Sequence, residues 1–243
     1  DGERTILGHR GANVFTDPNQ IGEEMLREAR LFHLSGYSLL AEPQRSAALL
    51  ALEMACRYGL TVTLDPGMTV SQSALDEMHA LLPVVDIFLP NLAEAQALTG
   101  LTEPEACAGA LLDVGVKVVV LKLGQEGCLV ADGSAMFRVP AFAVETRDST
   151  GAGDCFAAGF VAGFLGSLDL TGSAVLGSVL GAMSAAHVGA ASVAPRARAV
   201  LAMLRGPWPG ATEGDNLKSI ERVVDFVREM STEPEEEGKP WWA

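Results

Sequence analysis

The sequence predicts an α/β fold in which helices cover both faces of a mostly parallel β-sheet. Short apolar runs that suit buried strands alternate along the chain with longer segments that suit helices. Glycine and proline residues separate these segments at places where helices and strands usually end. This alternation is typical of parallel strands joined by helical crossovers. Because the 243 residues are 49% hydrophobic, the chain can bury one substantial core.

The first part of the chain contains three predicted strands and three predicted helices. Strands are expected at 31–36, 60–64 and 85–89, and helices at 20–30, 43–58 and 71–82. Pro43 stands in the first turn of the second helix and Gly59 follows its last turn, which is the usual placement of these residues. Residues 1–14 predict a turn followed by two short extended pieces.

The second part of the chain continues this pattern. We expect a helix at 104–114, a strand at 116–122, a strand–turn–strand hairpin at 122–130 and an outer strand at 135–139. Further helices are expected at 154–165, 171–188, 195–204 and 216–230. The segment 172–191 is apolar enough to suggest a membrane span, but its serines, histidine and glycines suit close packing in a soluble core better. Parallel sheets bind ligands beyond the carboxyl ends of their strands.

The most informative stretch is 148–156, Asp-Ser-Thr-Gly-Ala-Gly-Asp-Cys-Phe, which directly precedes an apolar helix. Gly151 and Gly153 allow the backbone to turn tightly and to approach a ligand closely. The first turn of a helix leaves N–H groups unpaired and carries partial positive charge, so this turn suits a phosphate. Asp154 stands beside that anion site, where its carboxylate could accept a proton from an attacking hydroxyl. A simple turn with Asp154 as a helix-capping acid is the alternative interpretation.

Two other strand ends carry polar residues. Asn91 and Glu94 follow strand 85–89 at the spacing of a capping box, which fixes the start of a helix. Lys122 precedes a turn bounded by Gly124 and Gly127, and a β-hairpin accounts for most of that pattern. Structural roles therefore explain these residues without any ligand.

The stretch 148–160 closely resembles the second signature of the ribokinase-like (PfkB) carbohydrate kinases. The resemblance implies a ribokinase-like three-layer α/β/α fold and ATP-dependent phosphorylation of a sugar hydroxyl. It implies that Asp154 is the catalytic base and that the anion hole consists of Gly151, Ala152 and Gly153. The implied cofactors are ATP and Mg²⁺. A P-loop enzyme is excluded, because the string G-x-x-x-x-G-K-[ST] does not occur.

The resemblance also assigns roles to the other polar positions. Asn91 and Glu94 match an element that orients magnesium and its waters near the ATP phosphates, which is reasonable chemistry for an amide and a carboxylate. Nucleotide contacts are implied for Lys122, Gly124, Gly127 and Thr150. A monovalent cation such as K⁺ is implied beside the anion hole, held by Asp148, Gly189 and Ser192 together with Thr150. For Gly189 a helix C-cap is an equally good interpretation.

The first residues of this sequence resemble a segment that is internal in other members of the family. A string ending in Gly-Ala-Asn, here residues 11–13, lies in that family near the small sheet that covers the sugar site. We therefore expect residues 1–15 to be a remnant of this lid, and the N-terminal portion of the fold to be absent. On the substrate side we expect Asn13, Ser35 and Gly36. Residues 1–205 are expected to form the kinase domain, and 206–243 a linker, an amphipathic helix and an acidic tail.

Composition limits the partners. A net charge of −14 argues against nucleic acid or an anionic membrane surface, because both attract clusters of lysine and arginine. Four widely spaced cysteines and the lack of a secretory pattern predict a cytoplasmic protein with reduced thiols. The expected partner is a small-molecule sugar, and a homodimer is the assembly that we consider. The alternatives are a nucleoside or vitamin-precursor kinase of the same superfamily, and a catalytically silent kinase-like protein with a binding or regulatory role.

Overall fold

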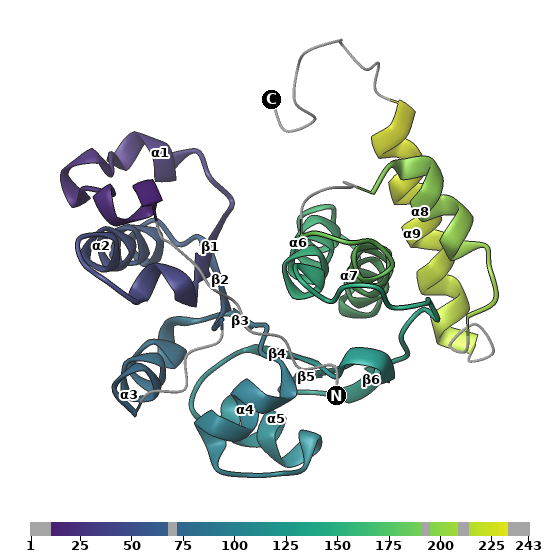
Figure 1. Cartoon of the computed structure of the whole chain (residues 1–243), viewed down its shortest axis with the longest axis horizontal. Helices are drawn as coiled ribbons and strands as arrows, with labels where there is room; N and C mark the ends of the chain where they lie inside the picture. Colours follow the sequence, from purple (N-terminus) through teal and green to yellow (C-terminus); the bar gives the residue numbers. More distant parts are fainter. Residues whose placement is uncertain (1–10, 68–71, 191–194, 209–213, 233–243) are drawn as a thin grey trace.

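The computed structural model of the chain describes residues 11–67, 72–190, 195–208 and 214–232. Its core is a sheet that lies between two groups of helices (Figure 1). The predicted α/β fold with a mostly parallel central sheet is therefore confirmed.

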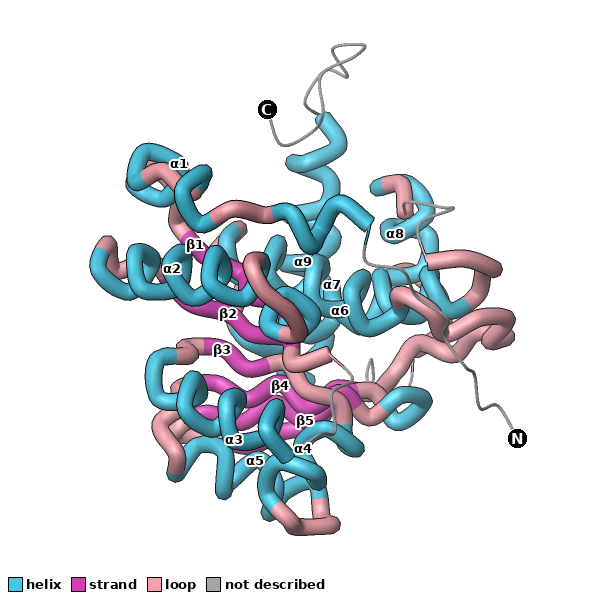
Figure 2. The backbone as a smooth tube through the Cα atoms, turned by 60° about the vertical axis from the view of Figure 1, so that its left-hand side comes forward, coloured by secondary structure: helices cyan, strands magenta, loops and turns pink. Residues whose placement is uncertain are grey.

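The sheet has six strands among the described residues, and they lie in chain order from β1 to β6. The strands are β1 (Leu31–Ser35), β2 (Thr61–Asp65), β3 (Ile87–Phe88), β4 (Val118–Lys122), β5 (Cys128–Asp132) and β6 (Met136–Val139). The first four strands are parallel, whereas β5 and β6 are antiparallel additions, as the hairpin pattern predicts. Because these four strands are parallel, their carboxyl ends lie along one edge of the sheet. Figure 2 shows the strands side by side, with helices on both sides of them.

Each face of the sheet has its own hydrophobic core. One face packs against α2 (Gln44–Arg57), α3 (Gln72–Leu81), α4 (Leu92–Thr99) and α5 (Pro104–Asp113). On the other face lie α6 (Ala152–Leu165) and α7 (Leu170–Ala185), and α8 (Ala197–Leu204) and α9 (Gly214–Thr232) join the same core by packing on α7. Because side chains alternate along a strand, Leu121 enters the first core and its neighbour Val120 enters the second.

The second face is polar at β1 and β2. Leu34 and Leu64 belong to the first core, so alternation turns His33, Thr63 and Asp65 toward the second face. Thr63 is buried there, and its hydroxyl oxygen lies 2.8 Å from Nδ1 of His33. The apolar contacts that hold α6 and α7 on β3 to β5 thus give way to polar groups beside the ends of these two strands.

Helices α6 and α7 lie side by side and meet through small residues (Figure 1). A Cβ atom added to Gly159 would lie 2.8 Å from the carbonyl oxygen of Leu176, and one added to Gly177 would lie 2.9 Å from that of Phe156. Glycine therefore allows the two backbones to touch, as the small-residue pattern predicts. Across the described residues, no helix is both long and apolar enough to cross a membrane.

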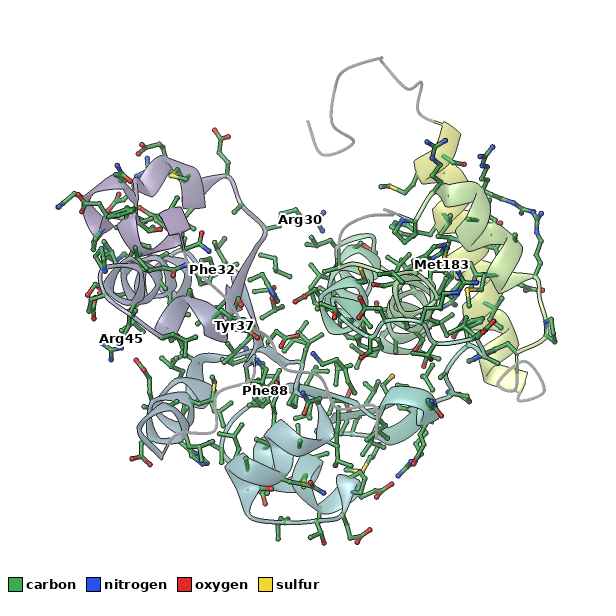
Figure 3. The ribbon with its side chains drawn as sticks, viewed as in Figure 1. Arg30, Phe32, Tyr37, Arg45, Phe88 and Met183 are labelled. Carbon is green, nitrogen blue, oxygen red and sulfur yellow. The ribbon has the colours of Figure 1, made fainter. Side chains whose placement is uncertain are left out.

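Helix α6 is also fixed at its C-terminal end. The guanidinium of Arg30, just before β1, donates a 3.1 Å hydrogen bond to the carbonyl oxygen of Leu165 (Figure 3). A cation at the end of a helix stabilises the unpaired carbonyl groups and the negative end of the helix dipole. The start of β1 is thereby tied to the last turn of α6.

Several predicted elements differ from the observed ones. Residues 11–15 form a short 3-10 helix, η1 (Gly11–Phe15), where an extended piece was expected; residues 1–10 lie outside the described part. The helix expected at 20–30 is only α1 (Glu23–Arg27): a separate 3-10 turn capped by Asp17 occupies Pro18–Gln20, and the helix runs between N-cap Gly22 and C-cap Glu28. Strand β3 has two residues, since the chain turns at Pro90 into the cap of α4.

The segment after α8 packs into the second core. The ring of Trp208 stacks on Phe142 at a centroid distance of 5.2 Å, and its Nε1 donates to the carbonyl oxygen of Pro140 at 3.0 Å. Val223 and Val227 on α9 are buried against α7 and α8. The predicted linker thus contains a core residue, Trp208, and the amphipathic helix extends the helical layer. Residues 233–243, the predicted acidic tail, lie outside the described residues.

Candidate active site

The turn before α6 has the geometry of an anion site. Gly151 has a φ of 77°, and a Cβ atom on it would lie 2.9 Å from the carbonyl oxygen of Ala190, so only glycine fits without strain. The amide of Ala152, which was expected in the anion hole, instead donates to the carbonyl oxygen of Ser149 at 3.2 Å. The backbone amides of Gly153 and Asp154 donate to no acceptor within the described ranges. They belong to the first turn of a 14-residue helix, where unpaired amides and the helix dipole favour an anion.

The carboxylate of Asp154 is available for chemistry. The side chain is exposed, and it accepts no hydrogen bond from any residue that the structure describes. Gly151 is the N-cap of α6, and no side chain caps this helix. The alternative interpretation of Asp154 as a capping acid is therefore not supported by a contact.

Asp148 fixes the shape of the turn. One carboxylate oxygen accepts from the amide of Thr150 at 2.9 Å, and the other accepts from the amide of Gly189 at 3.0 Å. The structure thus brings together three of the residues expected around a monovalent cation, whereas Ser192 lies outside the described residues. The cation itself stays a prediction. Gly189 is not a helix C-cap, because α7 ends at Ala185 and Ala186 is its C-cap.

Lys122 reaches the same turn from the end of β4. Its ammonium Nζ lies 3.5 Å from the position that a Cβ atom on Gly153 would occupy. Its partner is Asp65 at the end of β2, whose carboxylate oxygen is 2.5 Å from Nζ. Both side chains are largely buried, with exposed fractions of 13% for Lys122 and 14% for Asp65. A cation and two unpaired amides therefore converge at Gly153.

His33 faces this cluster from the middle of β1. Its side chain reaches the surface, yet desolvation of the ring lowers the pKa of His33 below the ordinary 6.5. The charges of Asp65 and Asp154 oppose this shift in pKa, and that of Lys122 adds to it. These four residues thus lie within electrostatic range of one another, at the polar part of the second face.

The predicted capping box is present at the start of α4. The Asn91 side chain accepts from the amide of Glu94 at 2.9 Å, and the Glu94 carboxylate accepts from the amide of Asn91 at 2.8 Å. The backbone bridge between Asn91 and Lys122 places this box beside the lysine. Each side chain commits one oxygen to the box and retains further acceptor capacity. The pair therefore fits a magnesium ion that keeps its own waters, although not a closed metal cage.

Burial gives Glu94 a measurable pH signature. The residue is only 8% exposed, and desolvation raises the pKa of its carboxyl above the ordinary 4.5, outweighing the amide of Asn91 and the charge of Lys122. The folded state therefore retains a proton that the unfolded state releases, so the contribution of Glu94 to the free energy of unfolding falls as the pH rises above 4.5.

Glu94→Gln is expected to remove this pH dependence. Glutamine keeps the side-chain oxygen that accepts from Asn91 but cannot titrate. We expect the stability of the variant, relative to the unmodified chain, to increase between pH 4.5 and pH 7 in urea unfolding experiments. A constant difference over this range would contradict the assignment.

Of the three expected substrate residues, Ser35 and Gly36 lie beside the cluster, whereas Asn13 lies on η1. Ser35 pairs in register with Asp65, and Gly36 packs so closely on the carbonyl of Pro66 that a Cβ atom would overlap it. These two expected substrate residues therefore lie beside the cluster. Asn13 lies exposed on η1, which packs against α2, and its side chain has no hydrogen bond to another candidate residue in the described part.

The hairpin glycines also differ from each other. Both have positive φ angles, 61° for Gly124 and 91° for Gly127. A Cβ atom on Gly127 would lie 2.0 Å from the carbonyl oxygen of Val139, so this glycine is required for packing against β6. The same atom on Gly124 would meet open space. Packing therefore explains Gly127 but not Gly124, and the nucleotide contacts expected at both glycines stay a prediction.

The sequence comparison identifies the family to which these features belong. The profile of the pfkB family carbohydrate kinases matches residues 1–197. The chain belongs to the pfkB family. The match includes the turn before α6, the capping box of α4 and the end of β4.

Curated proteins similar to this pfkB-family chain are longer than the matched segment. An uncharacterized sugar kinase from Archaeoglobus fulgidus is 30% identical over 80% of this chain and 76% of that protein. The ATP-dependent ribose-1-phosphate kinase of Halopiger xanaduensis is 33% identical over 84% of this chain and 64% of its own length. An ATP-dependent 6-phosphofructokinase from Thermoanaerobacterium thermosaccharolyticum is 28% identical over 76% of this chain and 59% of its own length. The chain thus spans only part of the length of these relatives.

Solved structures show the fold of this pfkB-family chain. A putative ribokinase II from E. coli, in complex with ATP and Mg²⁺, superposes with a TM-score of 0.73 and 25% identity, covering 78% of this chain and 63% of that one. A second structure is aminoimidazole riboside kinase from Salmonella enterica in complex with aminoimidazole riboside and an ATP analogue. It superposes with a TM-score of 0.74 and 23% identity, covering 82% of this chain and 70% of that one. The fold is therefore ribokinase-like.

Two residues of the cluster were not predicted from the pfkB-family motifs. Asp65 reads in sequence as part of Asp-Pro-Gly, a strand terminator, and His33 as one polar residue within an apolar run. Each residue is next to a core leucine in its strand, Asp65 next to Leu64 and His33 next to Leu34. Alternation along the strand could therefore have predicted that both side chains lie on the opposite face of the sheet. Polar residues on the otherwise apolar strands of a parallel sheet mark the face where a site lies.

Proposed function

We propose that this chain catalyses ATP-dependent phosphorylation of a sugar hydroxyl. One observation carries the proposal: the unpaired amides of Gly153 and Asp154 converge with the Lys122 ammonium next to an exposed carboxylate that accepts no hydrogen bond among the described residues. Three donors for an anion beside one free base are the groups that phosphoryl transfer to an alcohol requires. Membership of the pfkB family and the sugar kinases among its relatives support the same chemistry.

The mechanism follows from these groups. The hydroxyl oxygen of the acceptor bonds to the γ-phosphorus of ATP, and Asp154 accepts the proton of that hydroxyl. The bond from that phosphorus to the bridging oxygen breaks, so ADP leaves with the bonding electrons and Asp154 holds the proton. The amides of Gly153 and Asp154, with Lys122, stabilise the negative charge that develops on the transferring group. Positioning and electrostatics supply most of the acceleration in reactions of this kind.

Asn91 and Glu94 would hold Mg²⁺ through its waters, and the ion would neutralise charge on the phosphates. Asp148 contributes indirectly, because its two amide contacts hold the turn open in the required shape. A monovalent cation near Asp148 and Gly189 would serve the same purpose.

We expect the acceptor to bind beyond the polar ends of β1 and β2. Ser35, Gly36 and His33 lie on the side of Asp65 and Asp154, and they offer hydroxyl, amide and imidazole groups to a polyol. Among the relatives, the ribose-1-phosphate kinase and the 6-phosphofructokinase have phosphorylated sugars as acceptors by name, whereas the fructokinases have a free sugar. The panel of acceptors must therefore contain both classes.

The test is acceptor-dependent release of ADP by the purified chain. Free sugars, sugar phosphates and nucleosides are offered in turn with ATP and Mg²⁺, and products are identified by phosphorus NMR. We expect one sugar class to give turnover well above the acceptor-free rate. Turnover only with nucleosides would favour the nucleoside kinase, and ATP binding without transfer to any acceptor would favour the silent, regulatory alternative.

A further inference from the structure

Lys122 already has an anionic partner before any phosphate arrives. Asp65 and Lys122 come from strands separated by β3, and they are 57 residues apart in sequence. Their side chains cross the end of β3, which has only two residues, and meet at 2.5 Å. A second hydrogen bond joins Asp65 to the amide of Gly67 at 3.3 Å, so the carboxylate itself is anchored.

The contact restricts a side chain that is otherwise flexible. A lysine has four side-chain torsions, and an ammonium without a partner samples many positions. Asp65 uses one of the three ammonium donors and keeps the charge 3.5 Å from the Cβ position of Gly153. Two donors remain for an incoming phosphate oxygen. The cation is thereby fixed where charge develops during transfer.

The same carboxylate opposes the binding of nucleotide. A phosphate that contacts Lys122 comes within a few ångströms of the negative charge of Asp65, in a site where both side chains are largely buried. At the effective dielectric of such sites, repulsion between two charges at this separation exceeds the benefit of ordering one lysine side chain. Binding and transfer are therefore affected in opposite directions.

We propose that Asp65 is a positioning residue that holds Lys122 at the Gly153 turn for the transferring phosphoryl group, and that it does so at the expense of nucleotide affinity. The proposal rests on the proposed kinase function for its effect on transfer, but its effect on affinity does not require turnover. A residue that only stabilises the fold would weaken both properties together.

The test replaces Asp65 and measures affinity and rate separately. We expect Asp65→Asn to bind ADP about tenfold more tightly in calorimetry without magnesium, and to have a kcat about tenfold lower. Asp65→Glu retains the charge, so its affinity should stay near that of the unmodified chain and its kcat should recover in part. Asp225→Asn is the matched control: it removes the same charge from an exposed ion pair with Arg228 and should change neither value.

A double variant distinguishes positioning from other effects on rate. If Asp65 acts through Lys122, Asp65→Asn should lower kcat little further once Lys122→Met is present. Additive losses of kcat, or weaker ADP binding by Asp65→Asn, would overturn the proposal. Absence of turnover in the unmodified chain would count against the kinase function and the effect of Asp65 on transfer, whereas the ADP measurement would still decide the effect of Asp65 on nucleotide affinity.

Discussion

Asp154→Asn is expected to lower kcat by about 10²- to 10⁴-fold, the usual contribution of a general base. Asparagine has the same shape but cannot accept the proton of the acceptor hydroxyl. The side chain is exposed and makes no hydrogen bond within the described residues, so the free energy of unfolding should fall by no more than the ~0.3–1 kcal/mol that an acid in the first turn of a helix contributes. Affinity for ADP should be retained or increase, because a negative charge leaves the anion site. Steady-state kinetics, calorimetry and thermal unfolding measure the three effects.

Asp113→Asn provides the control for charge. Asp113 is exposed at the end of α5 and has no hydrogen bond or ion pair in the part of the chain described. The Asp113→Asn variant should therefore have the same kcat as the unmodified chain. If Asp154→Asn retained more than about one tenth of kcat, general-base catalysis by Asp154 would be excluded.

Gly159→Ala is expected to lower the free energy of unfolding by about 2 kcal/mol, as overpacking of a tight contact usually does. The added Cβ atom would lie 2.8 Å from the carbonyl oxygen of Leu176 and 2.9 Å from Cα of Gly177. Both are backbone atoms, so relief requires α6 and α7 to separate. Chemical denaturation measures the loss.

Gly109→Ala is the matched comparison. Gly109 lies inside α5, and a Cβ atom on it would meet no other atom within 4 Å. Alanine is the better helix former, so this variant should be stabilised by about 0.5–1 kcal/mol. Equal effects of the two substitutions would show that the contact between α6 and α7 does not limit stability.

Local patterns predicted the elements well where both ends carried a chemical signal. Pro43 and Gly59 bracket α2 within one or two residues, and the capping box of Asn91 and Glu94 starts α4 as expected. The first helix was predicted too long, because its apolar spacing continued through a stretch that Asp17 and Gly22 divide in the structure. Apolar periodicity alone therefore did not fix either end of that helix.

The site was predictable only where a motif is continuous in sequence. The turn from Gly151 to Asp154 is one stretch, so its chemistry could be inferred before its geometry. The contact between Lys122 and Asp65 could not, since neither residue contains a signal for a partner 57 positions away. Such pairs depend on strand order, and strand order depends on how whole helices pack.

The long sequence separation within the site has a consequence for how the molecule acquires function. Asp65 meets Lys122 across 57 residues, and Asp148 meets Gly189 across 41. Contacts of this kind close large loops, so forming them costs more chain entropy than forming contacts within one helix. Helical structure can appear early from local interactions, whereas the anion site exists only in the fully assembled chain. During refolding, we therefore expect ADP binding to recover later than helical structure.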